Sequence, residues 1–250
     1  MAKTMHSALK LTTIILFSFV LAITSTSCIR FIGLRGSGEV ITEERDVSQI
    51  DSISISAGIN LYLEQTGVEA LRIEAEDNII PLIITRVSDG ELNIRYDRFV
   101  LGGIFTRRPV NIYVNIDKIN SLRASSGANL ESGPIKTETL SINLSSGANG
   151  EIDLDVTELE SRLSSGANLR VSGSTENQDI NVSSGANYDG SGLRSNNAIV
   201  NVSSGGFVQV NVSENLIADI SSGGRVIHYG DPQIVSNISS GGSLESGSEN

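Results

Sequence analysis

Few residues in this sequence could do chemistry. It has two histidines and one cysteine, and zinc sites, Cys-His nucleophiles and Ser-His-Asp triads all need such residues, so these sites are disfavoured. His228 stands in Val-Ile-His-Tyr-Gly, where we expect the end of a strand beside a turn rather than a ligand. The sequence therefore predicts no catalytic residue, no metal site and no cofactor.

Acidic residues offer more room for acid–base chemistry. Strand alternation places Glu151, Asp153 and Asp155 on one outward face and Glu74 and Glu76 on another. Carboxylates that cleave sugars must flank a cleft, with one of them in an apolar setting that raises its pKa. An exposed strand lacks such a pocket, so catalysis is disfavoured. Calcium binding by the acidic strip 151–155 stays open, although the Gly-Gly-x-Gly-x-Asp repeat of calcium-binding β-rolls is absent.

Another candidate is the apolar, glycine-bearing stretch from Phe99 to Phe105, which Arg107 and Arg108 follow. Loops carry function more often than the elements they connect, so Phe105, Arg107 and Arg108 are the predicted binding residues. The alternative is a hairpin whose apolar side chains cap one end of the fold.

A tetrad, Ser-Ser-Gly-Ala or Ser-Ser-Gly-Gly, dominates the second half of the chain. Seven near-identical copies cannot all be nucleophiles, and a nucleophile elbow needs Gly-x-Ser-x-Gly with a histidine partner. The steps between copies are 20, 19, 19, 20, 18 and 18 residues. Such regular spacing is typical of a solenoid, in which each unit is one coil that stacks on its neighbours. The copies begin at Ser125, Ser145, Ser164, Ser183, Ser203, Ser221 and Ser239.

Strand alternation predicts the inside of each coil. Ile142 and Leu144 lead in phase to Ser146 and Ala148, whereas Asn143 falls in the outward phase. We therefore expect the second Ser of each tetrad to point inward with its hydroxyl bonded to a backbone group, and the next Gly to supply freedom at a bend. These repeat positions are Ser126, Ser146, Ser165, Ser184, Ser204, Ser222 and Ser240, with Gly127, Gly147, Gly166, Gly185, Gly205, Gly223 and Gly241.

The region before the tetrads is also β in pattern. Asp89-Gly90 predicts a turn between two alternating runs, and the segment Ser56 to Leu61 aligns with Ser125 to Leu130 as a degenerate first copy of the motif. The sequence thus predicts an all-β fold: a right-handed parallel β-helix-like solenoid with coils of about 18–20 residues. An N-terminal β cap region covers residues 40–122, and the repeat solenoid continues from it over residues 123–250.

The amino terminus indicates export. Lys3 and Lys10 precede the apolar run Leu11–Ile23, and small polar residues follow up to Cys28. A membrane-spanning helix needs roughly 20 apolar residues, and this run has about thirteen. Here the chain resembles a bacterial lipoprotein, in which the cysteine after the apolar run receives lipid. The resemblance implies a signal peptide over 1–27, lipidation of Cys28 and a tether over 28–39; the alternative is an ordinary secretory signal with a stray cysteine.

Charge excludes one class of partner. The whole chain carries −11, and removal of residues 1–27 takes away two lysines and no acid, which gives −11 − 2 = −13. Nucleic acid is disfavoured because phosphate binding needs a basic footprint larger than one Arg-Arg pair. Anionic lipid would also repel this surface, which leaves the acyl chains as the predicted attachment to the membrane.

The run from Asp51 to Leu63, followed by Glu74-Ala-Glu-Asp-Asn and Asp89-Gly-Glu-Leu-Asn-Ile, resembles the head GIN domain family. That family is labelled an autotransporter-adhesin head domain and has no assigned function. The resemblance covers roughly residues 40–245. It implies a β-solenoid on an exported bacterial protein, and it offers no catalytic residues to transfer.

Together these features predict a non-enzymatic, adhesin-like lipoprotein of the bacterial cell envelope. We expect it to be anchored to the outer membrane, on its periplasmic or its surface side, and to present its solenoid surface to a glycan or an envelope protein. Two alternatives stay open: a polysaccharide-acting enzyme on a β-helix scaffold, and a structural or signalling scaffold in the periplasm.

Overall fold

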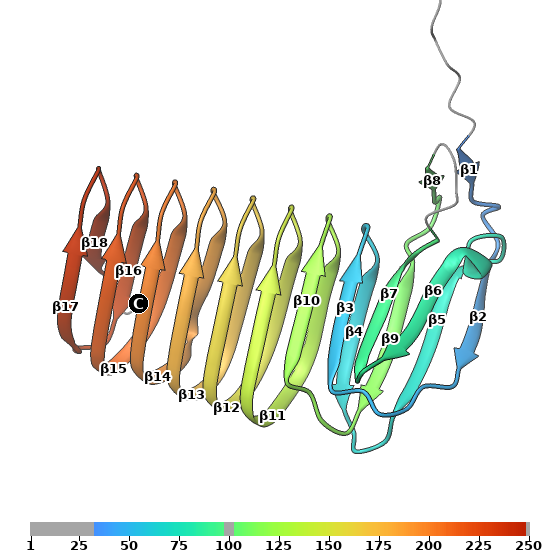
Figure 1. Cartoon of the computed structure of the whole chain (residues 1–250), viewed down its shortest axis with the longest axis horizontal. Coiled ribbons are helices and arrows are strands. Elements are labelled where there is room, and N and C mark those ends of the chain that lie inside the picture. The colour runs from blue at the N-terminus through green and yellow to red at the C-terminus, as the bar shows by residue number, and fades with distance from the viewer. Residues whose placement is uncertain (1–32, 98–102, 249–250) are drawn as a thin grey trace, which may run out of the picture. The chain divides into compact units, whose positions relative to one another are not determined.

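A computed structural model of the chain describes residues 33–97 and 103–248 (Figure 1). By their contacts these residues form two units: a small one with residues 33–34 and 103–104, and a main one with residues 35–97 and 105–248. In the small unit, the Leu34 N–H donates to the Gly103 carbonyl at 3.0 Å. The predicted signal peptide, Cys28 and the start of the predicted tether lie outside the described residues. No described helix is long and apolar enough to cross a membrane.

The body of the main unit is a β-solenoid. Its long strands each pair in parallel with the next one in chain order, with like positions in register: Asn149 lies beside Asn168, and Leu163 beside Val182. The predicted all-β solenoid is therefore confirmed. These strands are β11 (Asn129–Leu144), β12 (Asn149–Leu163), β13 (Asn168–Val182), β14 (Asn187–Val202) and β15 (Phe207–Ile220).

Shorter strands extend the stack at both ends. Towards the C-terminus, β16 and β17 pair with β15, and β18 pairs with β16. Towards the N-terminus, β10 and β3 continue one side of the coils, and β4 and β9 continue the other. Their bounds are β3 (Ser52–Ser56), β4 (Asn60–Gln65), β9 (Asn111–Ile116), β10 (Ser121–Ser125), β16 (Arg225–Tyr229), β17 (Gln233–Ile238) and β18 (Ser243–Ser246).

Each tetrad forms a tight turn between two strands. In the first copy, Ser126 and Gly127 have φ of 54° and 73°, and the Ala128 N–H donates to the Ser125 carbonyl at 3.2 Å. Two successive central residues with positive φ and this hydrogen bond define a type I′ turn. The second Ser and the Gly of every later copy also have positive φ, so all seven turns are alike.

The predicted inward direction of the second serines is wrong. Their side chains are exposed at the turns, so the hydroxyls need no internal partner; these residues are Ser126, Ser146, Ser165, Ser184, Ser204, Ser222 and Ser240. The cause is the pair of positive φ values, which reverses the chain and interrupts the two-residue alternation on which the prediction depended. The turns do line up from coil to coil, because the Gly147 N–H donates to the Ser165 carbonyl at 3.0 Å and later glycines do the same.

The Ala or Gly that closes each of the first six tetrads is buried as predicted, and so are the aliphatic residues before it. Ile142, Leu144 and Ala148 are fully buried, and equivalent residues stack above and below them. Burial of each larger aliphatic side chain contributes about 1.5–3 kcal/mol, and the stacking repeats this in every coil. One polar chain crosses the interior: the Tyr188 hydroxyl donates to Gln178 at 2.9 Å, and the Gln178 amide donates to the Ser195 hydroxyl at 2.6 Å.

The N-terminal end of the main unit is built differently. Antiparallel strands cover it: β5 pairs with β9, β2 pairs with β5, and β6 and β7 form a hairpin around the predicted turn at Asp89-Gly90. The segment Ser56–Leu61 aligns in register with Ser125–Leu130, which confirms it as a first copy of the motif, although Ala57 is exposed at the turn. These strands are β2 (Val40–Arg45), β5 (Ala70–Glu76), β6 (Ile83–Ser88) and β7 (Glu91–Tyr96).

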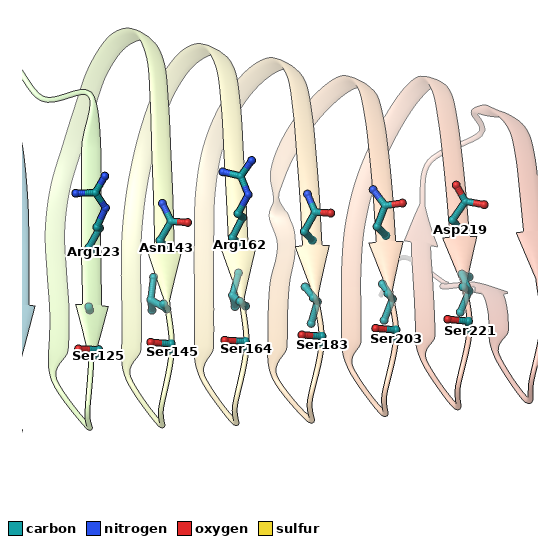
Figure 2. A pocket seen from close by; sticks show the side chains of 18 of the residues that line it. Arg123, Ser125, Asn143, Ser145, Arg162, Ser164, Ser183, Ser203, Asp219 and Ser221 are labelled. Carbon is teal, nitrogen blue, oxygen red and sulfur yellow. The ribbon is translucent and has the colours of Figure 1, made fainter.

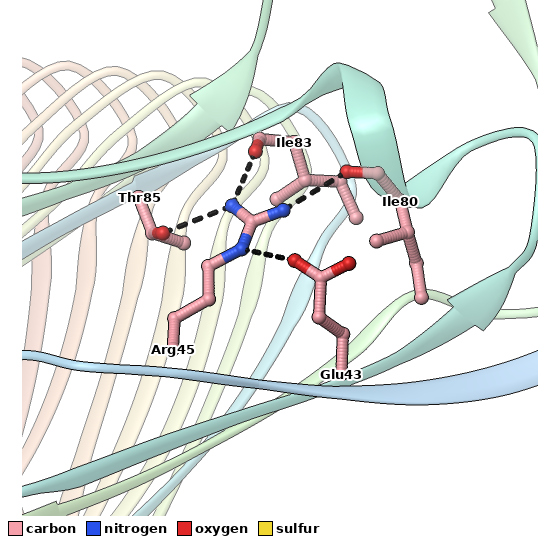
Figure 3. Close-up of polar contacts among 5 residues, drawn as sticks. All are labelled: Glu43, Arg45, Ile80, Ile83 and Thr85. Atoms are coloured by element: carbon pink, nitrogen blue, oxygen red, sulfur yellow. Dashed lines mark hydrogen bonds and ion pairs between the residues drawn. The ribbon is translucent and has the colours of Figure 1, made fainter.

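A single guanidinium ties this end together (Figure 3). Arg45, on β2, donates to the carbonyls of Ile80 and Ile83 at 3.1 and 2.6 Å and to the Thr85 hydroxyl at 3.0 Å. Its Nε forms an ion pair with Glu43 at 2.7 Å. The fixed fork of an arginine suits such divided bonding, so β2 is joined to the 3-10 turn η1 (Ile80–Leu82) and to β6.

Candidate functional site

A long open groove runs across the coils on the outer face of the strand segments that precede the turns, which we call the groove face (Figure 2). Its volume is about 790 Å³. Two rows of side chains line it. The serine column is the first Ser of each tetrad: Ser125, Ser145, Ser164, Ser183, Ser203, Ser221 and Ser239. The middle column, two residues earlier in each coil, is Arg123, Asn143, Arg162, Asn181, Asn201, Asp219 and Asn237.

The stacking of coils places these residues in columns. Arg123 is in register with Asn143, Asn143 with Arg162, and Arg162 with Asn181, and the same register continues to Asn237. Because parallel strands lie about 4.8 Å apart, a chain laid along the groove meets an equivalent set of groups at each such step.

Most of the middle column is held by neighbours in the protein. Arg123 is ion-paired with Glu91, and Arg162 with Glu160. The Asn143 amide donates to the Ser141 hydroxyl at 3.1 Å, and the Asn181 amide donates to Asp179 at 2.9 Å. These contacts fix the direction of the side chains, while the two guanidinium groups remain about half exposed.

The serine column is different. Among the residues that the structure describes, none of its seven hydroxyls bonds another protein group. Six of these seven serines are half-buried and the seventh, Ser239, is exposed. A hydroxyl both donates and accepts a hydrogen bond, which gives the groove a row of unused groups of each kind.

A third column borders the groove and changes character along it. It begins as Ser121 and Ser141, continues as Glu160 and Asp179, and ends as aliphatic residues. Those last side chains, Ile199, Ile217 and Val235, are in register with one another and are all exposed.

The strand segments that follow the turns carry an asparagine ladder, and we call their outer face the ladder face. Each amide donates to the asparagine of the preceding rung at 2.8–3.0 Å. The rungs are Asn111, Asn60, Asn129, Asn149, Asn168 and Asn187. This ladder was not predicted, yet the sequence carries a signal for it, because an Asn follows the Ala of four tetrads and the Ile of the degenerate copy.

The acidic strip lies on the ladder-face side and away from the groove. Asp155 forms an ion pair with Lys136 at 3.4 Å and accepts a hydrogen bond from the Ser174 hydroxyl at 3.0 Å. Asp153 accepts from the Ser172 hydroxyl at 3.4 Å. Within residues 33–97 and 103–248, no group of three His, Cys, Asp or Glu side chains could hold a metal ion.

The predicted outward direction of Glu76 is wrong, because the residue is buried. Its carboxylate accepts hydrogen bonds from the backbone N–H groups of Gly38 and Arg107 at 2.7 and 2.8 Å, and from that of Arg108 at 3.5 Å. These donors satisfy the charge inside the protein. Burial, and then the charge of Glu76, raise the pKa of the Tyr96 hydroxyl to about 12.

The predicted binding residues 105–108 lie apart from the groove. Phe105 belongs to β8 (Ile104–Phe105), which pairs with β1 (Leu34–Arg35), and its side chain is 56% exposed. Arg107 and Arg108 hold Glu76 through their backbone while both residues stay exposed. Binding by these residues stays a prediction, and the observed contacts give the segment a structural role.

His228 lies in β16 with a buried side chain, close to the end of the strand, and its Nδ1 has no partner among the described residues. On the N-terminal strands, Tyr62 stacks on Tyr113 at 5.0 Å between ring centroids, and the Arg72 guanidinium lies 3.9 Å from the Tyr113 centroid. Tyr113 thus has protein on both ring faces, which makes it a poor platform for a ligand.

Comparison with known proteins gives the fold clear relatives. A putative adhesin from Bacteroides fragilis is 21% identical and matches with a TM-score of 0.77, covering 86% of this chain and 99% of that one. A putative lipid binding protein from Parabacteroides distasonis (21% identical, TM-score 0.73) and a putative adhesin from Parabacteroides merdae (18%, 0.71) cover the same 86% of this chain and 99% of theirs.

Among curated proteins, none matches this chain significantly. Residues 49–232, which are most of the chain and include the asparagine ladder and all of the groove columns except Asn237 and Ser239, match the family described as "Putative auto-transporter adhesin, head GIN domain". The chain belongs to this family.

Proposed function

We propose that this protein is an adhesin-like module whose groove binds a linear glycan that lies along the solenoid, across successive coils. Family membership and the adhesin-named structural neighbours support an adhesin-like role at the cell envelope. The choice of ligand rests on the groove itself.

The observation that carries the proposal is the serine column with its unused hydroxyls. A glycan presents hydroxyls that donate and accept, and the serine hydroxyls and asparagine amides of the groove do the same. Register repeats this set in every coil, so a polymer with repeated hydroxyls gains one more set of hydrogen bonds for each coil it crosses.

Two other ligand classes fit the groove less well. Protein partners are usually anchored by buried Trp, Tyr or Arg in a well-packed pocket, and the groove is open and has no aromatic side chain in its lining. A lipid needs a mostly apolar cavity, whereas both columns of the groove are polar apart from the border at Ile199, Ile217 and Val235.

The test is calorimetric titration of the full chain carrying Cys28→Ser, with neutral and acidic linear oligosaccharides of increasing length. Affinity should rise with length until the ligand spans the six steps between seven coils, about 29 Å, and then level off. The variant Ser164→Ala/Ser183→Ala/Ser203→Ala should bind about tenfold more weakly or worse.

The same tetrads provide a matched control. Ser165→Gly/Ser184→Gly/Ser204→Gly changes the neighbouring serines, which face away at the turns and have a φ that glycine accepts. This variant should bind as the parent does. Equal losses of affinity in both variants, or no binding of any glycan, would refute the proposal that the groove is the binding site. If the protein instead cleaved the glycan, and Asp219→Asn abolished the cleavage, the alternative of a polysaccharide-acting enzyme would be favoured.

We also propose that the module is held at the envelope by a lipid on Cys28. Cells fed labelled palmitate should label the parent chain and not Cys28→Ser, and the variant should leave the membrane fraction. Protease treatment of intact cells then tells the surface side from the periplasmic side.

A further inference from the structure

The last coil of the solenoid ends in a bare strand edge. β17 pairs with β15 on one side, and no strand among the described residues pairs with its other side. All six residues of β17 are exposed, and its sequence, Gln-Ile-Val-Ser-Asn-Ile, has no charge. Natural proteins protect such edges with charges, prolines, bulges or a covering element, because a free, uncharged and apolar edge pairs with other strands.

The core is also open at this end. Ile234 and Ile238 are 41% and 45% exposed, although they occupy the same columns as Leu216 and Ile220, which are 0% and 1% exposed one coil earlier. The two side chains therefore point into the stack but have a neighbour on one side only. Another layer of strands would bury them as it buries every interior coil.

The N-terminal end of the main unit offers no matching surface. Its outer strands are antiparallel additions that carry charges, with Glu43, Glu44 and Arg45 on β2 and Arg86 on β6. Head-to-tail stacking would set this charged edge against the uncharged β17. The free edge of β17 is therefore better suited to pair with β17 of a second copy than with the N-terminal end of one.

We propose that two copies of this chain join end to end through β17, in antiparallel pairing about a two-fold axis at Ser236. The inward positions of β17 read Ile, Ser, Ile and are symmetric about Ser236. In this pairing Ile234 of each copy lies opposite Ile238 of the other, and Ser236 meets Ser236. Such an interface is isologous, so it closes as a dimer and does not propagate.

The neighbouring strand edge is compatible with the same axis. β18 pairs with β16 on one side, and its Leu244 also points inward in register with Val226. Its one charged residue, Glu245, forms an ion pair with Arg225 at 2.7 Å within the same copy. The dimer would thus join the ends of the two groove faces, and it does not depend on what the groove binds.

The first test is cross-linking of the full chain in a Cys28→Ser background, which removes the native cysteine. Opposed residues of an antiparallel pair have Cβ atoms about 4.5–5.5 Å apart, within small adjustments of disulfide geometry. Under mild oxidation Ser236→Cys should give a disulfide-linked dimer, while Ser213→Cys, an exposed position one coil earlier, should remain monomeric.

Sedimentation velocity supplies the second test. The Cys28→Ser chain should sediment as a dimer at micromolar concentration, and Ile234→Lys/Ile238→Lys should raise the dimer dissociation constant at least tenfold while circular dichroism stays unchanged. Val68→Lys, at an exposed aliphatic residue of the N-terminal region, should leave the dimer intact. A chain that sediments as a monomer, with Ser236→Cys and Ser213→Cys cross-linking equally, overturns the proposal. Assembly that continues beyond the dimer overturns the two-fold axis.

Discussion

The serine column and the asparagine ladder lie on either side of the same turns, yet they differ in whether their polar groups bond within the protein. Each asparagine bonds the next rung at 2.8–3.0 Å, whereas the serine hydroxyls bond nothing in the described protein. The rungs are about 4.8 Å apart, too far for two short hydroxyls to meet, while a longer amide with a donor and an acceptor spans the gap. The ladder face thus stabilises the stack, and the serine column of the groove face leaves its hydroxyls available to the proposed ligand.

The strongest loss of stability is expected at the bend between the two faces. Gly173 lies midway along β13 with φ of 108°, and a Cβ there would be 2.0 Å from the Leu154 carbonyl oxygen. Gly173→Ala should lower the free energy of unfolding by about 3 kcal/mol, measured by urea denaturation. Gly133→Ala, where a Cβ meets nothing within 4 Å, should stay within about 0.5 kcal/mol of the parent. Equal stability of the two variants would contradict the close approach of the Leu154 carbonyl to Gly173.

One alanine substitution on each face tests whether the ladder face serves stability and the groove face serves binding. Asn168→Ala removes two ladder bonds and should cost about 1–2 kcal/mol in unfolding free energy, with glycan affinity unchanged. Ser164→Ala, in the same coil, should leave stability unchanged and weaken glycan binding. The measurements are urea denaturation and calorimetric titration of both variants. If Asn168→Ala weakened binding as much as Ser164→Ala, the two faces would not be functionally distinct.

A smaller change is expected at the turn that separates the faces. Ser146 has φ of 53°, a conformation that asparagine accepts and that a β-branched residue resists. Ser146→Asn should raise the free energy of unfolding by about 0.5 kcal/mol, and Ser146→Val should lower it by about 1 kcal/mol. The melting temperature should shift in the same directions. Thermal unfolding followed by circular dichroism measures both. An inward Ser146 would give the reverse order, since valine suits an apolar interior.

The weakest effect is expected at Tyr96, which lines neither the groove nor the asparagine ladder. Burial and the charge of Glu76 favour the neutral Tyr96 hydroxyl in the folded protein, with a pKa of about 12 against 10.0 ordinarily. Its contribution to stability is therefore complete below pH 10 and is lost as the pH rises towards 12. Tyr96→Phe should lose less stability over this range than the parent does, as denaturation at stepped pH will measure. Identical pH dependence would show that Tyr96 has no part in alkaline unfolding.

The repeat made much of this fold predictable. Tetrad spacing indicated coils, and alternation before each tetrad correctly buried residues such as Ile142 and Leu144. The same alternation failed at Ser146, because a backbone reversal at two successive residues changes the phase and serine gives little sign of it. Glycine at the next position was the only local hint of a turn.

The candidate functional surface was less predictable because it depends on neighbours from other coils. Asn149 and Asn168 form rungs only once their strands are in register, although their equal offset from the tetrads could have indicated it. Glu76 could not have been placed, since its partners Gly38 and Arg107 are distant in sequence and donate through their backbone, which leaves no trace in residue type.

Register between equivalent coils makes the length of this protein easy to change in evolution. Duplication of one unit of 18–20 residues would insert a winding that finds the same neighbours above and below, without redesign of either terminus. Each insertion would lengthen the molecule by about 4.8 Å and add one more serine to the row. The length of the solenoid and the number of hydroxyls available to the proposed glycan would then increase together, by a single genetic event.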